Sequence, residues 1–247
     1  MRLAKIDLTL AILGMALILP EAKALPLADL AADFSNVTNP TPNGWAYRQG
    51  TTLLPSVADW TAGGFGWTQP AWARAATGNT ILPAWFESAG TPTAATGLDW
   101  ITGDVIVHST DGINGVGAGI ANVTWTSAVN GLINISGDIW NGRNIGRANS
   151  YTLLLNGGVL SSGGISSGDG HTRLNPLLFS SNGLSVHTGD VIELDIAATT
   201  TAGDFVGVNL NITQVAGAAT PEPATLGIAA LGFLAAGFRQ VLNRSRR

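Results

Sequence analysis

Apolar and polar side chains alternate with a period of two through the middle of the chain, which is the pattern of half-buried β-strands. The alternating segments are 122–126, 133–135, 192–196 and 206–212, and the segments 104–108 and 151–155 are strand-like as well. Between residues 25 and 219 no sustained helical period occurs. The pattern therefore predicts an all-β fold, an antiparallel β-sandwich of the jelly-roll type.

Dipeptides that favour tight turns separate these segments. They are Asp111-Gly112, Asn114-Gly115, Asn130-Gly131, Asn156-Gly157, Asn182-Gly183 and Gly189-Asp190. Residues 36–97 are rich in proline, and we predict long connections and short strands laid across the sandwich there. Residues 157–170 are rich in glycine and serine, so we predict a loop.

The N-terminal segment has the three parts of a secretory signal peptide. Arg2 and Lys5 precede an apolar run over 8–19, and the small residues Ala22 and Ala24 follow at the positions that signal peptidase reads. Twelve apolar residues are too few for a stable membrane span. We predict a signal helix over 1–24 that is removed after Ala24.

The C-terminal segment has a different composition. Pro221-Glu222-Pro223 is followed by an uncharged apolar run over 224–238 and by a basic tail over 239–247 with four arginines. As a helix the run is about 22 Å long, a marginal transmembrane span. The arginines favour a cytoplasmic tail and an external body. The predicted organisation is 1–24, a β-sandwich domain over 25–219, and a sorting segment over 220–247.

Charge and cysteine content exclude several classes of function. The segment 25–219 contains thirteen acidic residues, five arginines and no lysine, so its formal net charge is −8. A body this acidic does not bind nucleic acid, because phosphates need a cationic face. The chain has no cysteine, which excludes disulfides, thiolate metal sites and cysteine nucleophiles.

Four tryptophans are the candidates for sugar binding, because pyranose rings stack on flat apolar faces. Trp60, Trp67, Trp72 and Trp85 lie in Gly- and Pro-rich segments, where rings can be exposed. In a jelly roll, however, most tryptophans close the ends of the sandwich. Two others, Trp125 and Trp140, lie in predicted strands, and we expect these two rings in the core.

Acidic side chains offer two further hypotheses. Glu193 and Asp195 alternate on one strand, and we predict that they face solvent, which leaves no general acid for a glycosidase. Turn residues with oxygen donors could hold a structural calcium, with candidates Asp99, Asp104, Asp111 and Asn114. Turn formation by Asx side chains explains the same residues without an ion. We predict no catalytic residues and no other cofactor.

The C-terminal order of a Pro-Glu-Pro motif at Pro221, Glu222 and Pro223, an apolar span and an arginine cluster resembles the PEP-CTERM sorting signal of Gram-negative bacteria. This resemblance implies that an exosortase in the inner membrane recognises the motif and processes the tail. It also implies an association with exopolysaccharide and with the matrix of biofilms or flocs.

The body resembles, more loosely, a β-sandwich module common in proteins with this tag. The matching pieces are Asp33-Phe34-Ser35, Asn43-Gly44-Trp45-Ala46-Tyr47, the segment 151–157 and Gly189-Asp190-Val191-Ile192. The second piece departs from the usual Trp-Ser-Tyr-Gly order. Such modules look like carbohydrate-binding jelly rolls, although a fold does not fix a function.

Together these features predict a cell-surface or matrix protein with four partners: signal peptidase, an exosortase, the inner membrane before processing, and exopolysaccharide. An enzyme, either a glycoside hydrolase or a polysaccharide lyase, is the alternative from another class, and a close pair of buried carboxylates would favour it. A purely structural component of a biofilm matrix is the third reading.

Overall fold

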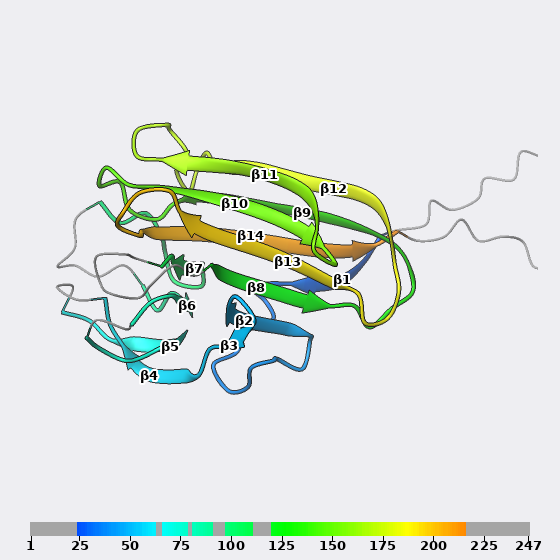
Figure 1. Cartoon of the computed structure of the whole chain (residues 1–247), viewed down its shortest axis with the longest axis horizontal. Helices are drawn as coiled ribbons and strands as arrows, with labels where there is room; N and C mark the ends of the chain where they lie inside the picture. The colour runs from blue at the N-terminus through cyan, green and yellow to red at the C-terminus, as the bar shows by residue number, and fades with distance from the viewer. Residues whose placement is uncertain (1–23, 63–65, 79–80, 91–96, 111–119, 216–247) are drawn as a thin grey trace, which may run out of the picture. The chain divides into compact units, whose positions relative to one another are not determined.

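The computed structural model describes residues 24–62, 66–78, 81–90, 97–110 and 120–215. These residues form fourteen strands in two stacked antiparallel sheets (Figure 1), which confirms the prediction of an all-β antiparallel fold. The predicted signal helix and the apolar span 224–238 lie outside the described residues. Within the described ranges, no helix is long and apolar enough to cross a membrane.

The larger sheet, sheet A, has β14 near its middle. Its strands in spatial order are β12 (Leu177–Val186), β9 (Gly131–Asn141), β14 (Phe205–Gln214), β7 (Val105–His108), β6 (Ala84–Glu87), β5 (Gln69–Ala73) and β4 (Ser56–Trp60), and β1 (Leu25–Asp29) pairs with the C-terminal half of β14. Sheet A therefore joins the first strand of the chain to the last.

The smaller sheet, sheet B, contains the other six strands. Its order is β11 (Gly158–Ser166), β10 (Ala148–Leu155), β13 (Val191–Ala198), β8 (Ala121–Thr126), β2 (Trp45–Gln49) and β3 (Thr52–Leu53). From β7 onward the chain passes from one sheet to the other at every connection except the β10–β11 hairpin. These repeated crossings are the connectivity of a jelly roll.

The main core lies between the two sheets and follows the predicted alternation. Ile133 and Ile135 of β9 are fully buried in one cluster with Val123 of β8 and Leu194 of β13. Because successive side chains of a strand point to opposite faces, the same alternation places the polar residues of these strands on the outer faces of the sheets.

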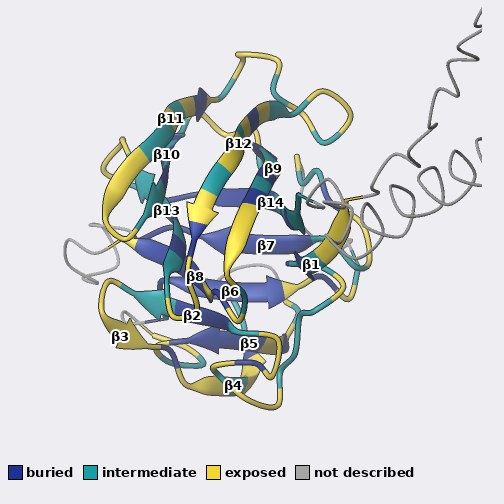
Figure 2. Ribbon diagram, turned by 90° about the vertical axis from the view of Figure 1, so that its right-hand side faces the viewer, coloured by how far each residue is buried: buried dark blue, intermediate teal, exposed yellow. Residues whose placement is uncertain are grey.

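A second core, which the sequence does not predict, covers part of the outer face of sheet A. Ile106 of β7 and Phe86 of β6 point outward but are fully buried in a cluster with Trp60, Trp100 and Trp140. Figure 2 shows β7 and β5 as buried strands, in contrast to the exposed residues of β12. The part of sheet A around β6 and β7 is therefore buried on both faces, whereas the outer face of the part nearer to β12 is open to solvent.

The segment 157–170 corrects the prediction of a loop. Residues Gly158–Ser166 form strand β11, which pairs with β10 along its length. Asn156 and Gly157 make the hairpin turn with φ angles of 50° and 79°. Glycine is required at Gly163, because a Cβ there would lie 2.7 Å from Cε1 of Tyr151. Glycine and serine on an edge strand carry no hydrophobic alternation, so the periodicity missed it.

The predicted turn at Asn182-Gly183 is instead an irregularity inside β12. The register of β12 against β9 shifts between Ser181 and Leu184, and Gly183 has a φ of 66°. The Gly183 N–H donates to Oδ1 of Asn134 on β9 at 2.8 Å. A turn signal in the sequence therefore marks a bulge here, which also needs a residue with positive φ.

The sequence pieces that carry the resemblance contact one another in two pairs. Asp33 accepts hydrogen bonds from Nδ2 of Asn43 at 2.6 Å and from Nε1 of Trp45 at 3.1 Å. Asp190 accepts one from Nδ2 of Asn156 at 3.0 Å. The first contacts join the segment after β1 of sheet A to the start of β2 of sheet B, and the second joins the β10–β11 turn to the start of β13 within sheet B.

Candidate functional site

The structure contradicts the predicted exposure of three of the four candidate tryptophans. Trp60, Trp72 and Trp85 are at most 3% exposed. The indole N–H of Trp60 donates to the Ile81 carbonyl at 3.0 Å, and that of Trp72 to the Ser35 carbonyl at 2.8 Å. The proline-rich segment that contains them forms strands rather than open loops. Trp60 lies in the second core and Trp72 and Trp85 lie in the main core, so these rings have no face for a sugar.

Trp67 is the fourth candidate, and it is half-buried. Its ring packs edge-on against Trp60 and Phe86, with centroids 6.1 Å and 5.8 Å apart. The expected burial of Trp125 and Trp140 is confirmed, since both are at most 3% exposed. Of the four candidates, Trp67 alone keeps part of its surface accessible.

The open part of sheet A carries two rows of short side chains across three strands. In the first row Leu178 of β12, Asp138 of β9 and Asn209 of β14 are aligned by strand register, and in the second row Ser180, Ser136 and Asn211 are aligned in the same way. Their strand neighbours point into the main core, so all six side chains lie on the outer face.

Five of these six side chains, all except Asn209, line a hollow of about 400 Å³. Its lining residues are Ser136, Gly137, Asp138, Leu178, Phe179, Ser180 and Asn211. A hollow of this volume falls in the range of small-molecule sites. The hollow therefore combines hydroxyl, amide and carboxylate groups with one exposed apolar side chain, that of Leu178.

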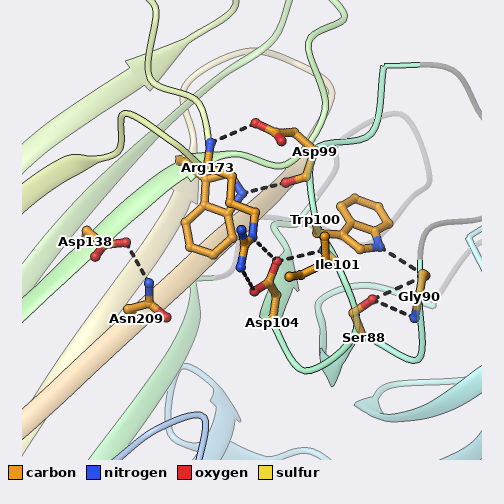
Figure 3. Close-up of polar contacts among 10 residues, drawn as sticks. Ser88, Gly90, Asp99, Trp100, Ile101, Asp104, Asp138, Arg173 and Asn209 are labelled. Carbon is orange, nitrogen blue, oxygen red and sulfur yellow. Dashed lines mark hydrogen bonds and ion pairs between the residues drawn. The ribbon is translucent and has the colours of Figure 1, made fainter.

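An ion pair lies near Asp138, and Figure 3 shows its hydrogen bonds. The Arg173 guanidinium donates from Nε and Nη2 to the two carboxylate oxygens of Asp104, at 2.6 Å and 3.0 Å. The backbone N–H of Arg173 donates to the Asp99 carboxylate at 2.7 Å. This bidentate geometry fixes the loop before β12 against the loop before β7.

The same ion pair bears on the calcium hypothesis. Asp99 and Asp104 are already engaged by Arg173, and Asp104 also accepts from the Ile101 N–H at 2.8 Å. Asp111 and Asn114 lie outside the described residues. Within the described ranges, no group of three His, Cys, Asp or Glu side chains is placed to hold a metal. The structure thus brings Asp99 and Asp104 together at Arg173, Asp99 on its backbone N–H and Asp104 on its guanidinium.

Asp138 is the only carboxylate among the lining residues of the hollow. Partial burial raises the pKa of Asp138, while the hydrogen bond from Asn209 at 3.0 Å and the nearby Arg173 charge lower it. Sequence reasoning did not select Asp138, Asn209 or Asn211. The alternation of 206–212 nevertheless places Asn209 and Asn211 on the face opposite the core, which is the signal that could have found them.

The pair Glu193 and Asp195 also differs from prediction. Both lie on the outer face of sheet B as expected, but Asp195 is half-buried rather than solvated. Burial and the adjacent Glu193 carboxylate raise the pKa of Asp195 to about 7. The prediction that both carboxylates face solvent and therefore leave no general acid is wrong for Asp195.

Asp204, at the start of β14, is a buried carboxylate that the sequence did not single out. It is 1% exposed, its Oδ1 accepts from the Phe205 N–H at 2.9 Å, and its Oδ2 has no hydrogen-bond partner among the described residues. Burial raises the pKa of Asp204 to about 6, although the hydrogen bond from the Phe205 N–H and the charges of Arg147 and Arg143 lower that pKa.

This raised pKa predicts how stability depends on pH. The folded protein holds the Asp204 proton more tightly than the unfolded chain. The contribution of Asp204 to stability is therefore fully present below about pH 4 and is lost as the pH rises through about 6. The loss is on the order of 2–3 kcal/mol. We expect Asp204→Asn to remove this part of the loss in urea unfolding at pH 4 and pH 7.5. The exposed Asp59→Asn control should keep the wild-type profile, and an equal profile for Asp204→Asn would contradict the prediction.

The fold places this protein in the class of all-β proteins built from two stacked antiparallel sheets. Residues 219–244 match the PEP-CTERM protein-sorting motif, so the chain carries this sorting signal. The match confirms the resemblance drawn from Pro221, Glu222 and Pro223, which lie within it. The motif implies an exported surface protein that is anchored in the membrane and then processed by an exosortase. Comparison with curated proteins gives no match.

Solved structures similar to the chain include carbohydrate-binding modules. One is the CBM22-1 xylan-binding domain from Paenibacillus barcinonensis Xyn10C, with 12% identity over 79% of this chain and 97% of that domain, at a TM-score of 0.33. Another is a CBM36 module in complex with calcium and xylotriose, with 18% identity over 44% of this chain and 76% of that one, at 0.28. At these TM-scores the similarities assign no ligand to this chain.

Proposed function

We propose that this protein is exported, held by its C-terminal segment, released by an exosortase, and binds exopolysaccharide in the hollow on sheet A. The observation that carries the binding half of the proposal is the pair of polar rows over the hollow. A structural sheet face needs only solvated polar side chains. Here Asp138 and Asn211 are half-buried in the lining of the hollow, and Asn209 holds the Asp138 carboxylate by a hydrogen bond.

The chemistry of the recess fits neutral sugar hydroxyls. Asp138 accepts hydrogen bonds, Asn211 both donates and accepts, and the two serine hydroxyls do either, so neighbouring hydroxyls of one sugar find complementary groups. The exposed side chain of Leu178 supplies an apolar contact for a ring face. The acidic body, with a formal net charge of −8 over 25–219, disfavours polyanionic glycans.

Replacing two lining residues tests the site. We expect Asp138→Ala and Asn211→Ala each to weaken retention of the full chain on exopolysaccharide gels about five- to tenfold, the loss of one or two hydrogen bonds to the ligand. Asp59→Ala, an exposed carboxylate on β4 at the far edge of the sheet, is the control. Unchanged retention in both variants, with normal melting temperatures, would reject the hollow as the binding site.

A polysaccharide-active enzyme, the alternative, would need different groups in this recess. A glycosidase uses two carboxyl groups about 5–9.5 Å apart. Asp138 is the one carboxylate among the residues that line the hollow, and Asp104, which does not line it, has both oxygens held by Arg173. This arrangement supports binding over hydrolysis. A purely structural matrix protein would retain no glycan on the same gels, so that experiment separates the third reading as well.

The sorting half of the proposal predicts a specific processing defect. We expect Pro221→Ala and Glu222→Ala to leave the protein in the inner membrane with its C-terminal arginines attached, because the exosortase no longer recognises the motif. Membrane fractionation and mass spectrometry of the C-terminal peptide report this. Gln214→Ala, just before the segment, is the control. Normal processing of both motif variants would make 224–238 an ordinary membrane anchor.

A further inference from the structure

The outermost strands of the two sheets differ in how they are protected from pairing with another chain. Sheet A ends at β1, β4 and β12, and sheet B ends at β3 and β11. β1 contains Pro26, β3 has only two residues, and β4 has a register shift and the exposed Asp59. The register of β12 shifts between Ser181 and Leu184. Proline, short length, charge and bulges are the usual protection of sheet edges.

β11 lacks this protection over most of its length. Residues 161–166 pair with 148–153 of β10 without interruption, since the bulge of β11 lies earlier, at Leu160. β10, β11 and β12 contain no charged residue and no proline. The segment 25–219 has a formal net charge of −8, so two copies repel each other in general. The side of the sandwich where β11 and β12 lie together (Figure 1) allows two copies to approach without bringing strand charges close.

The hydrogen bonds of the β10–β11 hairpin show which backbone groups of β11 point outward. The Ser167 N–H donates to the Arg147 carbonyl at 2.9 Å, so this pair is hydrogen-bonded. Hydrogen-bonded pairs recur at every second residue of an antiparallel ladder. Alternate residues from 161 to 165 therefore bond to β10, and the N–H and C=O groups of Ser162 and Gly164 point away from it.

The outward groups end at Ser166, which is closed by side chains of the same copy. Its N–H donates to Oδ2 of Asp169, and its carbonyl accepts from Nδ2 of Asn141 at 2.9 Å. Ser162 and Gly164 are both exposed, and among the described residues no strand pairs with their outward side. The open part of this edge is therefore short and centred on Gly163.

We propose that β11 pairs antiparallel with β11 of a second copy of this chain, so that sheet B continues across a symmetric dimer. A two-fold axis through Gly163 places Ser162 of each copy opposite Gly164 of the other. Each of these residues then donates its N–H to the residue opposite and accepts from it, as in any hydrogen-bonded pair of an antiparallel ladder. Gly163 and Gly164 have no side chain to keep the two strands apart.

A second copy fits this edge better than an unrelated peptide. A peptide that adds to a sheet edge is selected through pockets for its side chains. Along 161–166 the only exposed side chains are those of Ser162 and Ser166, which offer no such selection. The outward groups of Ser162 and Gly164 are instead complementary to themselves under a two-fold rotation, and every copy presents the same edge.

The dimer also determines where the two hollows lie. A two-fold axis that relates neighbouring strands of one sheet is perpendicular to that sheet, so the outer face of sheet A has the same direction in both copies. The two hollows then open to one side and can bind one polysaccharide together, which raises avidity. This consequence rests on the proposed function, whereas the dimer does not.

Sedimentation velocity of the full chain in mild detergent tests the pairing. At high-micromolar concentration we expect a reversible equilibrium between monomer and dimer. Ser162→Pro removes an N–H that β10 does not use, and proline is tolerated where the N–H of an edge strand faces solvent. This variant should melt near the wild-type temperature and dimerise at least about tenfold more weakly. Ser162→Thr keeps the N–H and should dimerise as the wild type does.

Disulfide trapping locates the contact, because the chain has no cysteine of its own. Ser162→Cys together with Gly164→Cys places a cysteine of one copy opposite a cysteine of the other. The Cα atoms of such a hydrogen-bonded pair lie about 5.5 Å apart, which suits a disulfide. Oxidation should yield covalent dimers. The matched control is Ser56→Cys with Ala58→Cys, two exposed positions on the edge strand β4, which should stay monomeric.

A folded wild-type chain that stays monomeric at high-micromolar concentration would overturn the proposal. A dimer that Ser162→Pro leaves intact, and that the cysteine pair at 162 and 164 does not link, would also overturn it and would indicate association through another part of the chain. If the proline variant does not fold, the cysteine pair decides alone. None of these measurements involves a glycan, so their outcome is separate from that of the retention experiment.

Discussion

Replacing Gly207 by alanine is expected to destabilise the fold by about 3 kcal/mol or more, because the site has no room for a methyl group. Gly207 lies on β14, and the indole of Trp140 from β9 crosses directly over it. A Cβ at Gly207 would lie 1.9 Å from Cε2 and 2.0 Å from Cζ2 of that ring. The ring cannot move freely, since its Nε1 donates to the Asp99 carbonyl at 2.7 Å.

Urea unfolding measures this cost, and Gly158→Ala provides the matched control. A Cβ at Gly158 would lie 3.3 Å from the Leu155 carbonyl oxygen, a contact that small shifts can relieve. We expect the control to stay within about 1 kcal/mol of wild type. If Gly207→Ala is as stable as Gly158→Ala, the indole of Trp140 does not lie over β14 as described.

Trp60→Ala is expected to cost about 3–5 kcal/mol of stability, the range for removing a large buried aromatic side chain. Trp60 is fully buried in the second core and packs against Phe86 with ring centroids 5.4 Å apart. The change leaves a cavity under the loops that cover sheet A and leaves the Ile81 carbonyl without its donor. Chemical denaturation of the full chain measures the effect.

Two further variants separate the contribution of packing from that of the hydrogen bond. Trp60→Phe keeps an aromatic ring but lacks the N–H, so it should recover more than half of the lost stability. Trp67→Ala removes a half-buried ring from the same cluster and should cost less than Trp60→Ala. A Trp60→Ala variant that melts normally but loses glycan retention would instead restore the stacking hypothesis at this position.

The periodicity of the sequence predicted most of the sandwich and none of the second core. Along β13 and the C-terminal half of β14, buried residues alternate with half-buried ones, and this is the case in which alternation is informative. On β7 three adjacent residues, Val105, Ile106 and Val107, are all fully buried. Such a run shows burial on both faces but does not identify the segments that cover the second face.

The candidate site was less predictable than the fold, for a physical reason. Aromatic residues were selected because they are chemically suited to sugars, yet the same large apolar rings gain most from burial. The hollow is lined by small polar residues such as Ser136 and Asn211, which are common on any sheet surface. Only strand register shows that they lie side by side on three strands, and register depends on long-range pairing.

The pairing of β1 with β14 sets an order on folding during export. A chain that crosses the membrane from its N-terminus delivers β1 first, but its partner β14 follows only after nearly the whole body has emerged. Phe205, which completes the second core, arrives with the same strand. In a chain exported from its N-terminus, the N-terminal strands therefore remain without their partner strand until β14 has emerged. Sheet A therefore closes only with the last described strand of the chain.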